Sequence, residues 1–169
     1  MSCYRRPFQT GATIFFTVNI ADRGQSLLTD QISLLRKSVK EARQDRPFRI
    51  DAWVVMPDHM HCVWTLPEGD RAYGQRWGVI KSKFTRYLRR VGFHPTVPSR
   101  SKRDKGDAGV WQRRFWEHHI RNEQDYAACV QYCWQNPVKH GFVQDPYEWA
   151  FSSIHRDMPR LTPALRKVG

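Results

Sequence analysis

Two histidines, His59 and His61, stand two residues apart in the sequence VVMPDHMHCVW at positions 54–64. The β-branched and aromatic residues around them predict a β-strand, in which alternate side chains point to the same face. Both imidazoles therefore emerge on one face, while Met60 and Cys62 point to the other. Two adjacent imidazoles can bind one metal ion, because histidine is a common metal ligand. A structural pair joined by hydrogen bonds is the alternative, so the metal interpretation needs support from other elements.

A catalytic metal site also needs a nucleophile and a third ligand, and a predicted helix in the last third of the sequence offers both. Val130 and Cys133 lie within about 40° of Tyr126 at 100° per residue, which is typical of a packing stripe. Tyr132 lies roughly 120° away from Tyr126, and Asn136 projects from the same side as Tyr132. We therefore expect Tyr126 to be structural and predict that Tyr132 and Asn136 face the two histidines together.

The positive charge of the chain is concentrated in one segment. The formal net charge is +12, and residues 71–105 hold eleven Lys and Arg against one acidic residue. A concentrated basic surface is typical of proteins that bind a polyanion, most often nucleic acid, although a solvated face is the alternative. The residues that we predict to contact a phosphate backbone are Arg5, Arg6, Arg76, Lys81, Lys83, Arg86 and Arg90. Those on a helix expected at 71–90 should project away from its apolar side, except Lys81, which lies near the apolar edge.

The hydrophobic periodicity predicts alternating strands and helices that must position these side chains. Strands are expected at 12–20, 48–56, 59–66 and 110–120, and helices at about 30–46, 71–90 and 122–136. Thr29 or Asp30 is the expected N-cap of the first helix, and Asn122 is that of the third. Pro47 and Pro137 are expected to end these two helices.

This order of elements is typical of an α+β fold, the ferredoxin-like split βαβ sandwich. In such a sandwich an antiparallel sheet has helices on one face, and we expect the C-terminal catalytic helix to lie across the other. The sequence predicts a single catalytic DNA-binding domain at 1–155, a flexible basic loop at 92–109 and a short basic tail at 156–169.

The composition argues against several classes of protein. Apolar residues make up 40% of the chain, which argues against a disordered polymer, and no apolar run reaches the roughly 20 residues of a membrane helix. The N-terminal stretch TIFFTVNI predicts a strand rather than an export signal, and the four cysteines form no CxxC pair. We therefore expect no membrane association, and a cytoplasmic location in which the thiols stay reduced.

Four motifs together resemble one known family. They are PDHMH, TLPEGD, WQRRFWEHHIRNEQDY and YCWQNPVKHGFV, at 57–61, 65–70, 111–126 and 132–143. Over positions 4–155 the chain is similar to the REP-associated tyrosine transposases, relatives of single-tyrosine insertion-sequence transposases within the His-hydrophobic-His endonuclease superfamily. The resemblance implies that Tyr132 is the nucleophile. It also implies that His59, His61 and Asn136 bind a divalent metal ion.

The resemblance further implies an endonuclease and strand transferase that acts on single-stranded DNA at hairpin-forming repetitive extragenic palindromes. The oxygen of Tyr132 would attack the scissile phosphodiester, leaving a 5′-phosphotyrosine link and a free 3′-hydroxyl. A neutral Asn in place of a third imidazole favours a hard cation, Mg²⁺ or Mn²⁺. Family members imply either a monomer or a homodimer, in a cytoplasmic, nucleoid-associated location.

Two other functions are compatible with the residues. One is a non-catalytic nucleic-acid-binding ferredoxin-like module, although the aromatic signature of RNA-recognition modules is absent. The other is a zinc hydrolase that uses water as its nucleophile and forms no covalent adduct. Cys129 and Cys133 are compatible with a metal site that includes a histidine, but buried free thiols are the favoured interpretation. His118 and His119 should point to opposite sides of their strand, and Asp58 is interpreted as a turn residue that can also orient the neighbouring histidine.

Overall fold

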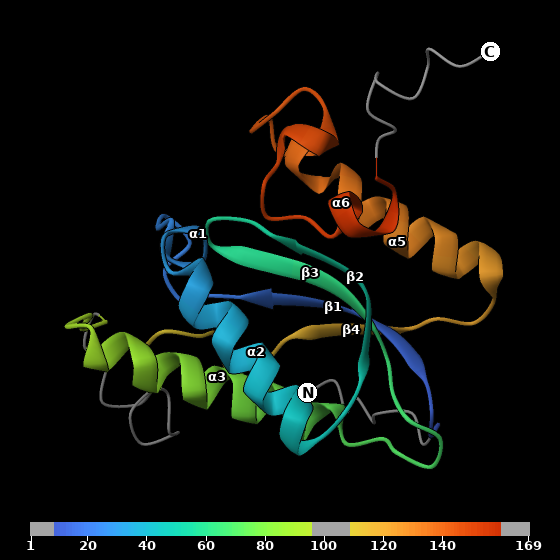
Figure 1. Cartoon of the computed structure of the whole chain (residues 1–169), viewed down its shortest axis with the longest axis horizontal. Coiled ribbons are helices and arrows are strands. Elements are labelled where there is room, and N and C mark those ends of the chain that lie inside the picture. The colour runs from blue at the N-terminus through green and yellow to red at the C-terminus, as the bar shows by residue number, and fades with distance from the viewer. Residues whose placement is uncertain (1–8, 96–108, 160–169) are drawn as a thin grey trace, which may run out of the picture.

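The centre of the molecule is a four-stranded antiparallel sheet with the strand order β2-β3-β1-β4 (Figure 1). A computed structural model describes residues 9–95 and 109–159. The strands are β1 (Thr13–Asn19), β2 (Arg49–Val55), β3 (His59–Thr65) and β4 (Trp116–His119). The first three coincide with segments rich in β-branched and aromatic residues, and β4 lies within the fourth predicted segment. The predictions that lie outside the described residues are those for Arg5, Arg6, most of the loop 92–109 and most of the tail 156–169.

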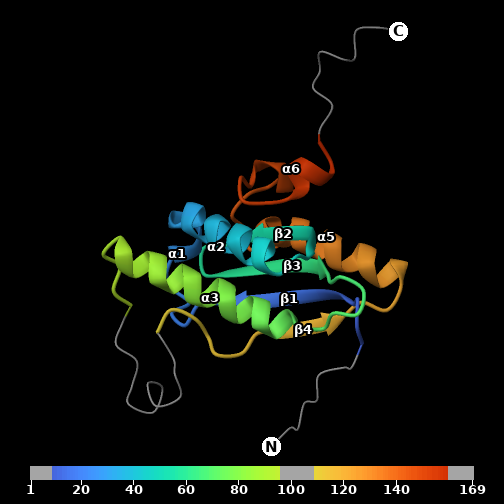
Figure 2. The same ribbon diagram turned by 60° about the horizontal axis from the view of Figure 1, so that its bottom comes forward.

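Helices cover both faces of this sheet (Figure 2). The helices are α1 (Leu27–Asp30), α2 (Ile32–Asp45), α3 (Tyr73–Arg90), α5 (Glu123–Lys139) and α6 (Ile154–Asp157), and a 3₁₀ turn η1 spans Pro146–Glu148. Helices α2 and α3 pack on one face, and α5 crosses the other. The predicted α+β sandwich, with a C-terminal helix across the second face, is confirmed.

The larger core lies between the sheet and helices α2 and α3. The stripe that predicted α3 is buried, and its members are Trp77, Ile80, Phe84 and Leu88. Trp77 stacks on Trp64 of β3 with ring centroids 4.2 Å apart, so two large aromatic surfaces leave water together. Among the described residues, none of the helices combines the length and the apolar composition needed to cross a membrane.

A smaller core fixes α5 on the opposite face of the sheet. Phe15 of β1, Val63 of β3 and Val54 of β2 are buried there against Val130 and Cys133 of the helix. Phe15 and Val63 are directly paired in the β1–β3 register, so their side chains stand side by side on this face. This packing determines which side of α5 faces the sheet, and hence which of its polar residues reach the histidines of β3.

Helix α5 begins as predicted and ends one turn later than predicted. The side chain of Asn122 accepts a hydrogen bond from the backbone N–H of Asp125 at 2.8 Å, which confirms the N-cap. The prediction that Pro137 ends the helix is wrong, because α5 continues to Lys139. Proline removes only one backbone donor, and the turn that follows closes with the N–H of His140 donating to the carbonyl of Asn136 at 3.0 Å.

Two other boundary predictions are wrong. Thr29 and Asp30 do not cap α2; they belong to the separate short helix α1, where both side chains hydrogen-bond to Ser26. The fourth strand is limited to 116–119, because Trp111 makes only an isolated bridge to Ile20. In both places the residue types alone would allow a longer regular element than the structure contains.

Arg76 is buried, although the helical pattern predicted that it projects into solvent. Only 1% of the residue is exposed. Its guanidinium donates hydrogen bonds to the carboxylate of Asp70 at 2.6 and 3.1 Å and to the carbonyl oxygen of Pro47 at 2.9 Å. These acceptors come from the connections before β2 and before α3, which periodicity within α3 cannot reveal. The orientation predicted for Arg76 is therefore wrong, and its donors hold two connections together.

We expect Asp70→Ala to lower the free energy of unfolding by about 3 kcal/mol, because it leaves a buried guanidinium without its counter-ion. The matched control is Lys83→Ala, which breaks a more exposed pair with Glu41 and should cost clearly less, because water screens that pair. Urea denaturation followed by circular dichroism measures both. Equal losses in the two variants would show that the Arg76 pair has no special structural role.

Candidate active site

His59 and His61 emerge on the face of β3 that α5 covers. Each residue is only 4% exposed, and the two ring centroids are 5.0 Å apart with an interplanar angle of 82°. Buried histidines at this spacing need polar partners, since an unpaired imidazole nitrogen is costly away from water. The structure thus brings the two side chains together on one face, as the strand pattern predicted.

Each imidazole has one nitrogen already engaged. Nδ1 of His59 donates to the carboxylate of Asp58 at 2.6 Å, and Nδ1 of His61 is hydrogen-bonded to Oγ1 of Thr17 at 2.9 Å. Arg23 in turn pairs with Asp58 at 2.8 Å. This pattern is typical of metal-binding histidines, because the partner at Nδ1 orients the ring and leaves Nε2 for the ion. The alternative role considered for Asp58 is observed, whereas Thr17 was missed, although its place opposite His61 in the β1–β3 pairing could have indicated it.

The electrostatic surroundings keep both rings neutral at physiological pH. Burial, together with the neighbouring His59 and His140, lowers the pKa of His61 to about 3. Burial also lowers the pKa of His59, although the carboxylate of Asp58 opposes the shift. A neutral imidazole has a lone pair that can bind a cation, so the protonation state suits metal binding.

Asn136 lies at the same site and is 1% exposed. Within the described residues, neither Oδ1 nor Nδ2 of its side chain makes a hydrogen bond, although the amide lies close enough to His61 to favour the charged form of that ring. A buried amide without partners is costly, and a bound cation would give its oxygen one. The residues His59, His61 and Asn136 therefore fit a divalent metal ion.

Tyr132 sits beside this trio and remains accessible. It is 42% exposed, and its ring centroid is 5.2 Å from that of His61. Nζ of Lys139 lies 5.1 Å from the centre of the tyrosine ring, which places a positive charge next to the phenol. An accessible tyrosine beside two buried histidines and a lysine ammonium group is suited to attack an anionic substrate.

Tyr126 occupies a structural position, as predicted. Its ring packs against the smaller core, and its hydroxyl donates to the carboxylate of Asp51 at 3.4 Å. Burial and the nearby Asp51 raise the pKa of Tyr126. The two tyrosines of α5 are thus separated by the helix geometry, with only Tyr132 next to the histidines.

His140 is a residue at the site that the sequence reasoning missed. It follows the last residue of α5, and its ring centroid is 5.1 Å from that of His59. Its position four residues after Asn136 was the available signal, since such residues share one side of a helix. The site therefore has a third imidazole at its solvent-facing edge.

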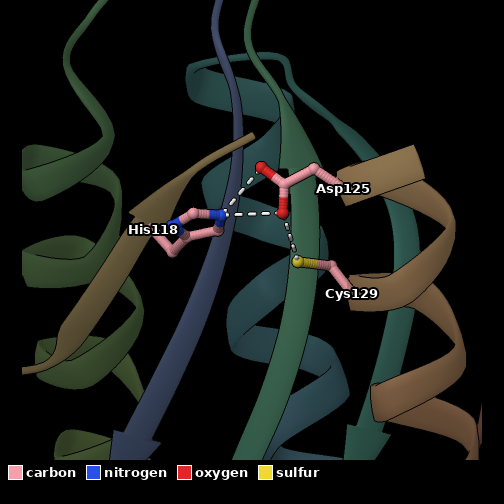
Figure 3. Close-up of side chains that lie close together, drawn as sticks. All are labelled: His118, Asp125 and Cys129. Atoms are coloured by element: carbon pink, nitrogen blue, oxygen red, sulfur yellow. Dashed lines mark hydrogen bonds and ion pairs between the residues drawn. The ribbon is translucent and has the colours of Figure 1, made fainter. Parts of the chain in front are cut away.

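A separate polar group lies at the other end of α5 (Figure 3). Nε2 of His118 donates to both carboxylate oxygens of Asp125 at 2.9 Å, and Sγ of Cys129 is 3.9 Å from the same carboxylate. In the described part of the chain, this is the one trio of His, Cys, Asp or Glu whose ligand atoms lie within 4.8 Å of one another. Cys133 is buried and takes no part in it.

The basic residues predicted to contact DNA have diverse surroundings. Lys83 pairs with Glu41 at 2.8 Å, and Nζ of Lys81 donates to the carbonyl of Gln112 at 2.9 Å. Arg86 and Arg90 are exposed at the surface of α3. With Arg76 buried, these two offer the most accessible guanidinium groups of the predicted set on this helix, and DNA contact by any member remains a prediction.

Comparison with known proteins agrees with this geometry. The chain is 47% identical over 160 residues to a REP-associated tyrosine transposase of Escherichia coli K12, covering 95% of this chain and 87% of that protein. A Haemophilus influenzae relative is 40% identical over 158 residues, covering 94% of this chain and 88% of the relative. The solved structure of a REP-associated tyrosine transposase bound to a REP hairpin matches with a TM-score of 0.78 and 46% identity, over 96% of this chain and 89% of that one. No protein-family model matches. The chain belongs to the REP-associated tyrosine transposases.

Proposed function

We propose that this protein is a divalent-metal-dependent endonuclease and strand transferase that acts on single-stranded DNA beside hairpin-forming palindromes. The observation that carries the proposal is the position of Tyr132, an accessible phenol whose ring lies 5.2 Å from the buried ring of His61. The relative that was solved with a REP hairpin supports a hairpin as the DNA substrate of this chain.

His59, His61 and Asn136 are the residues that would hold the cation. When bound, Mg²⁺ or Mn²⁺ would polarise the scissile phosphodiester and stabilise the negative charge that develops on it. Asp58 and Thr17 engage the Nδ1 atoms and so leave both Nε2 atoms for coordination. An amide oxygen as the third ligand favours a hard cation over tightly bound zinc.

Cleavage exchanges one phosphodiester for another. The oxygen of Tyr132 gives up its proton to solvent and forms a bond to phosphorus, while the bond from phosphorus to the 3′ oxygen breaks. That oxygen takes up a proton and leaves as a 3′-hydroxyl, and the 5′ phosphate stays linked to Tyr132. A second 3′-hydroxyl can attack the link and rejoin strands without a nucleotide cofactor, because the intermediate is itself a phosphodiester.

Lys139 has a place in this scheme through its position over the ring of Tyr132. Its ammonium group lies 5.1 Å from the ring centre, close to where a phosphate must approach the phenol. A cation at this point attracts the DNA backbone and offsets the charge that builds up during attack. We therefore assign Lys139 the task of holding the scissile phosphate against the nucleophile.

The proposal predicts that Tyr132→Phe abolishes a covalent protein–DNA adduct, because the substitution removes the attacking oxygen. Tyr126→Phe is the matched control and should keep the adduct, since its hydroxyl donates to the carboxylate of Asp51. The measurement is a denaturing gel after incubation with Mg²⁺ and labelled single-stranded DNA that carries a hairpin. An adduct lost only in Tyr126→Phe would reverse the assignment. Cleavage without an adduct would indicate a hydrolase with water as nucleophile, and binding without cleavage a non-catalytic module.

A second prediction concerns the metal ion. Asn136→Ala should weaken Mn²⁺ binding by at least about tenfold, because it removes one of three protein ligands. Cys129→Ser, in the polar group at the other end of α5, should leave the affinity unchanged. Electron paramagnetic resonance of free Mn²⁺ measures both affinities. Weaker binding in Cys129→Ser, with Asn136→Ala unaffected, would move the metal site to His118, Asp125 and Cys129.

A third prediction concerns the contribution of α3 to DNA binding. The double variant with Arg86→Ala and Arg90→Ala should reduce the slope of log affinity against log salt by about 0.7 for each lost phosphate contact. Arg49→Ala removes an exposed arginine that is paired with Asp51 on β2, and it should leave the slope unchanged. Fluorescence anisotropy at several salt concentrations gives the slopes. An unchanged slope in the double variant would exclude this surface as the DNA contact.

A further inference from the structure

A cavity of about 550 Å³ opens beside Tyr132. It lies between β1, β4 and the first half of α5. Residues that line it include Phe15, Trp116, His118, Asp125, Ala128 and Tyr132. Thr17, which hydrogen-bonds to His61, also lines the cavity, but the proposed cleavage reaction assigns no role to Trp116, His118, Asp125 or Ala128.

Aromatic rings form one wall of this cavity. Phe15 lies between Trp116 and Tyr132, with ring centroids 5.7 Å from each and both contacts edge-to-face. Trp116 is 58% exposed, and its ring is nearly parallel to that of His118, at 10°. A large aromatic side chain that stays exposed beside a cavity is typical of a surface on which an unpaired base stacks.

A carboxylate lies at the other side of the cavity. Asp125 accepts hydrogen bonds from Nε2 of His118 and from the backbone N–H of Arg121 at 3.0 Å. These donors lower the pKa of Asp125, so the group is ionised at neutral pH. A carboxylate oxygen can accept a further hydrogen bond from an exocyclic amino group of a base, the pairing that aspartate makes with cytosine N4.

We infer that this cavity binds one unpaired nucleobase next to the scissile phosphate, stacked on Trp116 and directed with its amino group toward Asp125. The occupant is a base of the DNA strand, because the cavity adjoins the proposed nucleophile and combines a stacking wall with a carboxylate that can accept a hydrogen bond. This inference rests on the proposed function and adds the substrate's local sequence to it: cytosine, adenine or guanine is accepted at this position, and thymine is disfavoured because it has no amino group.

The same residues are less suited to a metal ion. Burial and the nearby Asp125 raise the pKa of Cys129 to about 11, so its thiol stays protonated at neutral pH, whereas metal binding requires the thiolate. Asp125 already accepts hydrogen bonds from His118 and from the backbone N–H of Arg121. A neutral base needs neither deprotonation nor the loss of these contacts.

The experiment measures base stacking independently of cleavage. The probe is hairpin-bearing single-stranded DNA with 2-aminopurine placed, one position at a time, at the nucleotides that flank the cleavage point. It is bound to Tyr132→Phe, which cannot cut, and to the same protein with Ala128→Phe added. Ala128 is exposed on α5 and lines the cavity, so a phenyl ring there fills the space without removing any wall. Met158→Ala, an exposed apolar residue of the segment after α6, is the matched control.

We expect fluorescence quenching at one flanking position in Tyr132→Phe, the same quenching when Met158→Ala is added, and loss of the quenching when Ala128→Phe is added. In the enzyme with Tyr132 intact, an abasic nucleotide at that position should slow adduct formation by about 5- to 150-fold, and Ala128→Phe should abolish this penalty. Thymine there should also react more slowly than cytosine.

Quenching that is absent at every flanking position, or equal with and without Ala128→Phe, would overturn the nucleobase pocket even if the adduct forms normally. Failure of the intact enzyme to form any adduct would instead overturn the proposed function, while the quenching data would still decide whether a base occupies the cavity.

Discussion

The packing of α5 against the histidine-bearing face of the sheet is the constraint on which the candidate site depends. Val130 and Cys133 are buried against Phe15 and its neighbours, and this contact fixes the rotation of the helix. Because residues four apart lie on one side of a helix, the same rotation brings Tyr132 and Asn136 over β3. A small apolar core therefore sets the position of Tyr132 relative to His61, although the two residues are 71 positions apart in the chain.

Strand pairing supplies the second part of the arrangement. The β1–β3 register places Thr17 opposite His61, and the turn between β2 and β3 places Asp58 against His59. Each imidazole thus has its Nδ1 atom held by a neighbour whose position follows from the sheet itself. Burial lowers the pKa of both rings, so the sheet holds two neutral imidazoles in a fixed orientation.

Local periodicity was enough to predict the features of the site that repeat along one element. The two-residue spacing of the histidines and the four-residue spacing of Tyr132 and Asn136 are properties of a strand and a helix, and both patterns appear in the structure as expected. Features that depend on a second segment were not predictable in this way. Arg76 is buried because its acceptors come from the connections before β2 and before α3, and α5 passes Pro137 because the following turn closes its own hydrogen bonds. Sequence patterns describe faces of elements, whereas these contacts arise between elements.

The buried amide of Asn136 shows a conflict between stability and function. Oδ1 and Nδ2 of Asn136 form no hydrogen bonds within the described structure. Each such unsatisfied group lowers the free energy of unfolding by on the order of 1–3 kcal/mol. An apolar residue of similar size would pack at this position of α5 without that cost, so folding alone does not favour asparagine here. In the proposed enzyme the amide oxygen gains its partner only when the cation binds. Cation binding then removes this energetic cost, so the protein is less stable when the site is empty. Because Asn136 and Tyr132 are on the same helix, the affinity for the cation depends on the position of the helix that carries the proposed nucleophile.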